Sequence, residues 1–83
     1  MEIFYTRKAA EAFEKLPRQV QKRIVDKMRF YAVQKDPLKF AERLTDYREG
    51  GFRFRIGDYR LAFDVKGGAI YVLKIGKRDA MYD

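Results

Sequence analysis

The strongest constraint in the sequence is a run of alternating apolar and polar residues in its last third. From Phe52 to Phe63 the side chains alternate with period two around the pair Gly57-Asp58. This alternation is typical of half-buried strands, and a glycine followed by a second turn residue is typical of a two-residue hairpin loop. The sequence therefore predicts a β-hairpin with one apolar face and one cationic face.

The register of this hairpin places two arginines directly opposite each other. With the turn at Gly57-Asp58, Arg55 faces Arg60, and Arg53 lies on the same side. Like charges opposite each other destabilise a sheet, whereas the planar fork of arginine matches phosphate. We interpret this pair as an anion-binding feature. The other face is expected to form the core with Phe52, Phe54, Ile56, Leu61, Phe63 and Val65.

Two helices are expected before the hairpin. Apolar residues at helical spacing indicate one helix over residues 7–16, with Thr6 as its N-cap, and a second over residues 17–34, begun by a proline. A short strand over residues 2–5 precedes both. Residues 38–49 read as a polar connection that has room for one helical turn around Phe40–Leu44.

A last strand is expected over residues 70–75, and its register depends on the Gly67-Gly68 loop. A two-residue loop would bury Lys74, which is costly. A three-residue loop instead sets Lys74 beside Arg60 and buries Leu73, so we predict the longer loop.

These elements predict a single domain over residues 1–83 of the α+β class. The order is β-α-α-β-β-β, with a small, mainly antiparallel sheet covered on one face by a helical hairpin.

Composition narrows the chemistry. The 83 residues include 19 Lys and Arg against 12 Asp and Glu, a net charge of +7 that favours polyanionic partners. The absence of cysteine, histidine and serine excludes disulfides, thiolate or imidazole metal sites and the usual catalytic triads. We therefore expect no metal and no cofactor. No stretch approaches the length of a membrane span or resembles a signal peptide, so a cytoplasmic protein is expected.

The element order and two motifs together resemble the RelE/ParE toxin superfamily of toxin–antitoxin pairs. The motifs are the segment from Phe52 to Phe63, with its Gly-Asp-Tyr-Arg turn, and the ending Gly-Lys-Arg-Asp-Ala-Met-Tyr that closes at Tyr82. The resemblance covers essentially the whole chain. It implies a RelE-like fold and a toxin that a cognate antitoxin protein neutralises.

Within this superfamily, RelE-like members cut mRNA in the ribosomal A site without a metal. The resemblance therefore implies an endoribonuclease, an mRNA interferase that inhibits translation with mRNA and the ribosome as partners. Its catalytic residues would be Arg60, Arg78 and Tyr82, with Arg55 helping to hold the scissile phosphate. Tyr82 stands closer to Arg78 than in the best-known member. Three further cations would bind RNA: Arg53, Lys74 and Lys77.

One departure from the family pattern bears on catalysis. Arg53 and Arg55 stand where the best-known member has two lysines, and arginine does not act as a general base. Glu42, Lys74 or Lys77 is the candidate base, or no discrete base exists. Two alternatives stay open: a ParE-like toxin that inhibits DNA gyrase, and an inactive module that binds RNA or an antitoxin.

Overall fold

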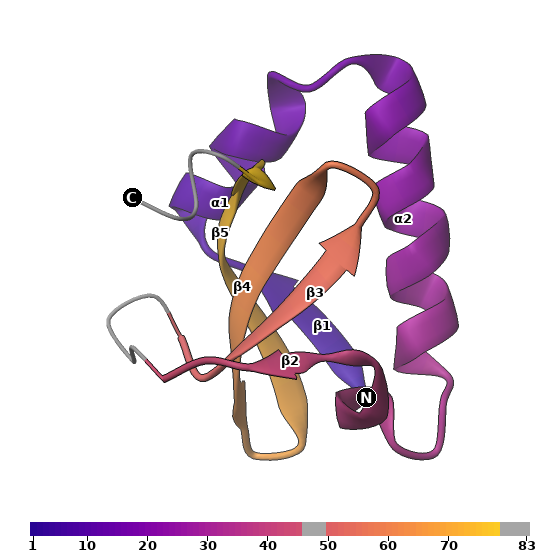
Figure 1. Cartoon of the computed structure of the whole chain (residues 1–83), viewed down its shortest axis with the longest axis vertical. Coiled ribbons are helices and arrows are strands. Elements are labelled where there is room, and N and C mark those ends of the chain that lie inside the picture. Colours follow the sequence, from indigo (N-terminus) through magenta and orange to yellow (C-terminus); the bar gives the residue numbers. More distant parts are fainter. Residues whose placement is uncertain (46–49, 79–83) are drawn as a thin grey trace.

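The chain folds into two helices and a twisted sheet. A computed structural model describes residues 1–45 and 50–78. Its elements are β1 (Glu2–Tyr5), α1 (Arg7–Glu14), α2 (Arg18–Ala32), the 3₁₀ turn η1 (Pro37–Phe40), β2 (Glu42–Arg43), β3 (Phe52–Ile56), β4 (Tyr59–Lys66) and β5 (Ala69–Lys77). The strands of this described part form one sheet in the order β1-β5-β4-β3-β2 (Figure 1).

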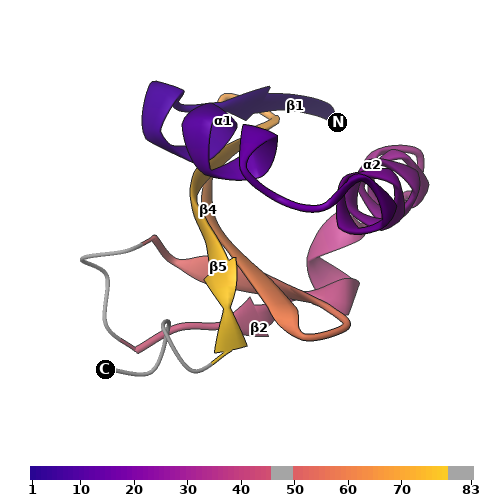
Figure 2. The ribbon, with the colours of Figure 1, turned by 90° about the horizontal axis from the view of Figure 1, so that it is seen from above.

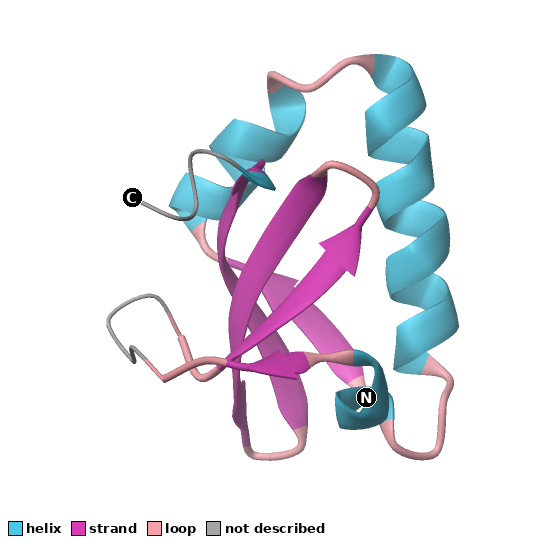
Figure 3. Cartoon of the chain, viewed as in Figure 1, coloured by secondary structure: helices cyan, strands magenta, loops and turns pink. Residues whose placement is uncertain are grey.

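The α+β class and the predicted order of helices and strands are confirmed, with one addition. β1 runs parallel to β5, and the other neighbouring strands are antiparallel. The addition lies in the segment expected to be a polar connection, which contains η1 and the short edge strand β2 (Figure 3). A strand of two residues is too short to show a periodic pattern in the sequence. β2 is therefore recognised only by its pairing with β3.

Both predicted helices are present, but each ends two residues earlier than expected, and Pro17 caps α2 from outside and is not its first residue. Thr6 Oγ1 accepts a hydrogen bond from the Ala9 amide at 3.1 Å, which caps the start of α1. At the other end of α1, Gln21 Nε2 donates to the Phe13 and Glu14 carbonyls at 3.0 and 3.3 Å. The side chain of Gln21 thereby ties the end of α1 to α2. From this connection the two helices diverge, as Figures 1 and 2 show.

The core lies between α2 and the apolar face of the sheet. The ring of Tyr31 stacks on Phe54 with a centroid distance of 4.2 Å, and Phe54 stacks on Phe63 at 4.4 Å. Ile24 and Met28 from α2 are buried in the same cluster. The cluster is completed by Ala9, Ile56, Leu61, Ile70, Val72 and Ile75. The apolar face predicted for the hairpin is thus the core face.

The register of β5 differs from the prediction in an informative way. The loop at Gly67-Gly68 has two residues, both with positive φ (57° and 76°), as in type I′ hairpin turns. A β-bulge then inserts Leu73, because Ala62 pairs with Lys74 while Phe63 pairs with Val72.

The bulge changes which residues of β5 face the core. Before it, Ile70 and Val72 are buried, and after it the buried residue is Ile75. Leu73 was predicted to be buried and is only partly so, and that prediction was wrong. Lys74 nevertheless lies on the face of Arg60, as expected, because the bulge shifts the phase by one residue.

Thr6 connects this bulge to α1. Its amide donates to the Val72 carbonyl at 3.0 Å, and its hydroxyl donates to the Leu73 carbonyl at 3.3 Å. The same oxygen accepts the capping bond from Ala9. One side chain therefore serves a helix terminus and an irregular strand together.

We predict that Thr6→Val lowers the free energy of unfolding by about 1–2 kcal/mol, because it removes the cap and leaves the Leu73 carbonyl without its hydroxyl donor. Urea denaturation measures the change. Thr45→Val is the matched control, since Thr45 is exposed and should shift stability by less than about 0.5 kcal/mol. Equal stability of the two variants would contradict the bridging role.

Candidate anion-binding site on the β3–β4 hairpin

The predicted pair of opposed arginines is present in the hairpin. Arg55 on β3 and Arg60 on β4 are directly paired, next to the Gly57-Asp58 turn. Gly57 has φ of 60°, a left-handed conformation that glycine adopts without strain. The turn therefore fixes the register that brings the two charges together. The arginines lie on the sheet face opposite the core.

The two members of this pair have different environments. The Arg55 side chain is exposed and makes no ion pair with any described residue. Arg60 is 2% exposed, and its Nη1 donates to the carbonyls of Gly57 and Tyr59 at 2.9 and 3.0 Å. Its Nε is buried without a hydrogen-bond partner. Arg60 thus holds the turn with one nitrogen, while its buried Nε is left without an acceptor.

Arg53 and Glu42 form an ion pair across the edge of the sheet. Arg53 Nη2 lies 2.9 Å from Glu42 Oε2, and the two residues are paired between β3 and β2. Arg53 is 8% exposed, whereas the side chain of Glu42 is 49% exposed. The predicted RNA-binding arginine and the candidate base therefore contact each other.

The two predicted lysines lie on opposite faces of the sheet. Lys74 pairs with Ala62 and shares the face of Arg60. Lys77 pairs with Tyr59, so it is exposed on the helix side at the end of β5.

Arg78 follows β5 directly beside the hairpin turn. Its amide donates to the Asp58 carbonyl at 2.9 Å, and the residue is exposed. The main chain of Arg78 is thereby held against the same turn that Arg60 contacts. Tyr82 lies outside the described residues.

Arg23 of α2, which its spacing places on the solvated side of the second helix, also reaches this region. A Cβ atom at Gly57 would lie 2.8 Å from Arg23 Nη1, so this guanidinium rests on the turn. We define the hairpin tip as Gly57 and Asp58 with the two arginines that contact Gly57, Arg60 from β4 and Arg23 from α2. The tip therefore includes a helix residue. Sequence spacing alone does not reveal such a contact between distant segments.

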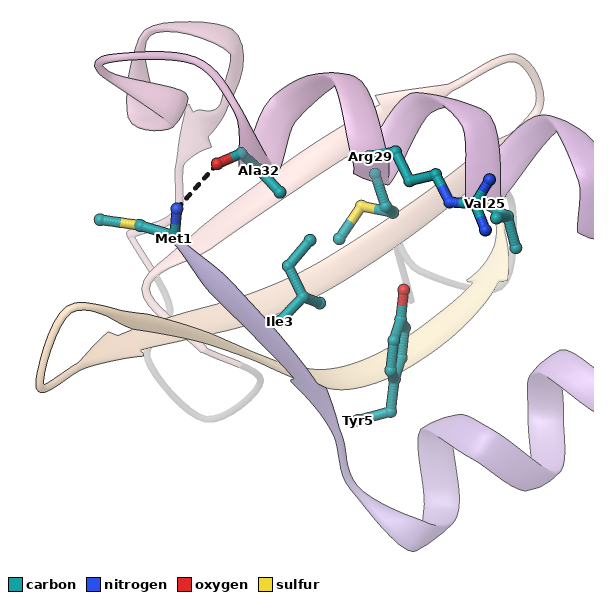
Figure 4. A pocket seen from close by; sticks show the side chains of 7 residues that line it. Met1, Ile3, Tyr5, Val25, Arg29 and Ala32 are labelled. Carbon is teal, nitrogen blue, oxygen red and sulfur yellow. Dashed lines mark hydrogen bonds between the residues drawn. The ribbon is translucent and has the colours of Figure 1, made fainter.

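A second feature is an apolar hollow between β1 and α2, about 310 Å³ in volume (Figure 4). Its lining consists of Met1, Ile3, Tyr5, Val25, Met28, Arg29 and Ala32. Partial burial raises the pKa of the Tyr5 phenol, which stays neutral at physiological pH. At one end, the Met1 amino group donates to the Ala32 carbonyl at 2.7 Å.

Within residues 1–45 and 50–78, no group of carboxylates is arranged to hold a metal ion. No helix of this part of the chain is long and apolar enough to cross a membrane.

Comparison with known families identifies the kind of protein. Residues 3–82 match the family described as the ParE toxin of type II toxin–antitoxin systems. The chain belongs to this toxin family. It is a type II toxin of the RelE/ParE superfamily. A comparison with curated proteins found no significant match.

Solved structures resemble the toxin over nearly its whole length. A chain of the toxin–antitoxin complex RelBE2 from Mycobacterium tuberculosis is 24% identical with a TM-score of 0.76, and the match covers 93% of the toxin and 96% of that chain. The intact RelBE complex of E. coli gives 16% identity, a TM-score of 0.72 and coverage of 92% and 94%. The RelE-RelB complex of Pyrococcus horikoshii OT3 gives 23%, 0.72 and 93% of both chains. These likenesses establish the RelE-like fold.

Because Arg55 is exposed and Arg60 is buried, we predict that replacing each arginine changes the free energy of unfolding of the toxin differently. Arg55→Gln should leave the free energy of unfolding unchanged or raise it by about 0.2–1 kcal/mol, because it relieves like-charge repulsion. Arg60→Gln should lower it by about 1–3 kcal/mol, because the Gly57 and Tyr59 carbonyls lose their charged donor. Urea denaturation of both variants measures the difference. A stability loss at Arg55 that equals or exceeds the loss at Arg60 would contradict this assignment.

Proposed function

We propose that the toxin is a metal-independent endoribonuclease that cuts mRNA in the ribosomal A site. The observation that carries the proposal is the opposed pair of Arg55 and Arg60, beside the strand end from which Arg78 follows. One of these guanidinium groups has a buried Nε without a partner, and another is exposed without an ion pair among the described residues. Such an arrangement suits a phosphate group.

The proposed chemistry is internal transesterification. The 2′-oxygen of one ribose attacks the adjacent phosphorus, the bond to the 5′-oxygen breaks, and a 2′,3′-cyclic phosphate forms. The proton of the 2′-hydroxyl passes to a base, proposed as Glu42, Lys74 or Lys77, or to water where no discrete base exists, and the 5′-oxygen takes a proton from Tyr82 or from water. Charge that develops on the phosphorane would be stabilised by Arg55, Arg60 and Arg78, and one such preorganised donor contributes typically about 2.7–4 kcal/mol.

Proton transfer in this mechanism needs an acid for the leaving oxygen and a base for the 2′-hydroxyl. Tyr82 is the proposed donor to the leaving oxygen, or it stacks on a neighbouring base. Glu42, the candidate base, forms its ion pair with Arg53. This pairing favours electrostatic stabilisation as the main contribution of the site, with Arg53, Lys74 and Lys77 as proposed RNA contacts.

A second candidate function is inhibition of DNA gyrase. It is favoured by the match of residues 3–82 to a family described by its ParE toxins. The two bonds from Arg60 Nη1 to turn carbonyls also agree with a structural role for this arginine. In that case the arginines are dispensable for toxicity.

The double variant Arg60→Lys, Arg78→Ala separates these functions. Lysine keeps the buried charge but removes the planar fork, so loss of activity would not follow from loss of charge at position 60. For the nuclease we expect wild type to arrest growth and to create new mRNA 5′ ends that require ribosomes, and the variant to do neither. Thermal melting of the purified variant verifies that it is folded. Full growth arrest by the folded variant, with gyrase-dependent DNA breaks, would overturn the nuclease proposal.

We also propose that an antitoxin protein neutralises the toxin, because the similar structures are toxin–antitoxin complexes. The toxin offers it two contrasting surfaces. One is the cationic sheet face around Arg55, which suits acidic side chains. The other is the hollow beside β1, where Tyr5 and Met1 are 39% and 41% exposed.

We predict that the untagged toxin co-purifies with an acidic or amphipathic protein from cells that express its whole locus. The affinity should fall as salt rises, because salt screens attraction to a protein with a net charge of +7. Titration calorimetry at several NaCl concentrations measures this dependence. Purification of the toxin alone from such cells would contradict the proposal.

A further inference from the structure

The hairpin tip has cations on both sides of its turn. Arg60 approaches from the sheet face opposite the core, and its Nη1 lies 2.9 Å from the Gly57 carbonyl oxygen. Arg23 approaches from α2, with Nη1 2.8 Å from the place of a Gly57 Cβ. These two contacts and the bonds of Gly57 that join them form a continuous path between the Nη1 atoms of Arg23 and Arg60. The length of this path limits the distance between the two atoms to about 10 Å. The two charges therefore lie within about one Debye length of each other.

The guanidinium of Arg23 has neither a hydrogen-bond acceptor nor an ion-pair partner among the described residues. Asp26, one turn further along α2, does not pair with it. Asp58 is the carboxylate of the tip itself, and it too forms no ion pair within the described part of the chain. The tip thus gathers Arg23 and Arg60, neither of which forms an ion pair with a described residue.

A second, independent observation also points to an anion at the tip. The Nε of Arg60 is buried without a hydrogen-bond partner, and the residue is 2% exposed. A buried donor nitrogen that lacks an acceptor is costly, even though Nη1 of the same guanidinium donates two hydrogen bonds. An anion brought to the tip would offset this cost, and it would reduce the repulsion between Arg23 and Arg60.

We propose that Arg23 binds a phosphate of the RNA strand next to the phosphate held by Arg55 and Arg60, so that the strand passes around the hairpin tip. This inference rests on the proposed RNA-cleaving function and extends its site from the sheet to α2. Arg23 would position the strand and would not take part in the chemistry. The guanidinium of Arg23 can lie against the turn because Gly57 has no side chain.

The test measures binding of a fluorescein-labelled oligouridylate to the purified toxin by anisotropy at several NaCl concentrations. For a single strand, each lost phosphate contact lowers the slope of log affinity against log salt by about 0.7. Arg23→Ala should therefore lower this slope by about 0.7 and weaken binding roughly tenfold at low salt. Arg23→Lys keeps the charge and should preserve the slope.

Lys35→Ala is the control for net charge, because Lys35 is exposed beyond the far end of α2. It should leave the slope unchanged. Equal effects of Arg23→Ala and Lys35→Ala would overturn the assignment of Arg23.

Further outcomes separate this inference from the proposed function. If mRNA cleavage depends on Arg60 and Arg78 while Arg23→Ala leaves RNA binding unchanged, the inference fails and the nuclease proposal stands. If Arg23→Ala weakens antitoxin binding and not RNA binding, the tip serves the antitoxin and the inference is also overturned. Failure of wild type to bind RNA at low salt overturns it as well.

Discussion

The β-bulge at Leu73 is the constraint on which the rest of the molecule depends. Without the bulge, β5 would either place Lys74 on the core face or turn Ile70 and Val72 away from the core. The extra residue lets Ile70 and Val72 face the core near β1, while Ile75 faces it beyond the bulge. The bulged carbonyls are satisfied by Thr6, which also begins α1. The register of the sheet and the position of the first helix are therefore set by the same few atoms.

Much of this fold follows from local patterns. The hairpin register was predictable because Gly57 and the strict alternation around it allow one pairing. The apolar residues at helical spacing that predicted α2 were equally clear. The register between β4 and β5 was not predictable. A two-residue loop followed by a bulge puts Lys74 on the same face as a three-residue loop without a bulge would. The residue pairing then differs only nearer the loop, where Val72 and not Leu73 meets Phe63.

The candidate site was predictable to a smaller extent. Sequence placed Arg55 opposite Arg60, but burial separates their roles, since Arg60 also ties the turn by two hydrogen bonds. The contact of Arg23 with Gly57 was invisible, because it depends on how α2 crosses the hairpin and not on spacing along the chain. The ion pair of Arg53 with Glu42 likewise required β2, an element too short to detect.

The edge position of β1 has a consequence for the handling of the isolated chain. β1 pairs with β5 on one side, and its other side is an open edge in the described sheet. Natural edge strands are blunted by short length, charged side chains, a proline or a bulge; β1, EIFY, is short but carries a single charged residue, Glu2, and no lysine or proline. Phe4 is 44% exposed beside this edge. Edge-to-edge pairing between copies is therefore the expected route of self-association, and solubility should depend on what occupies this edge.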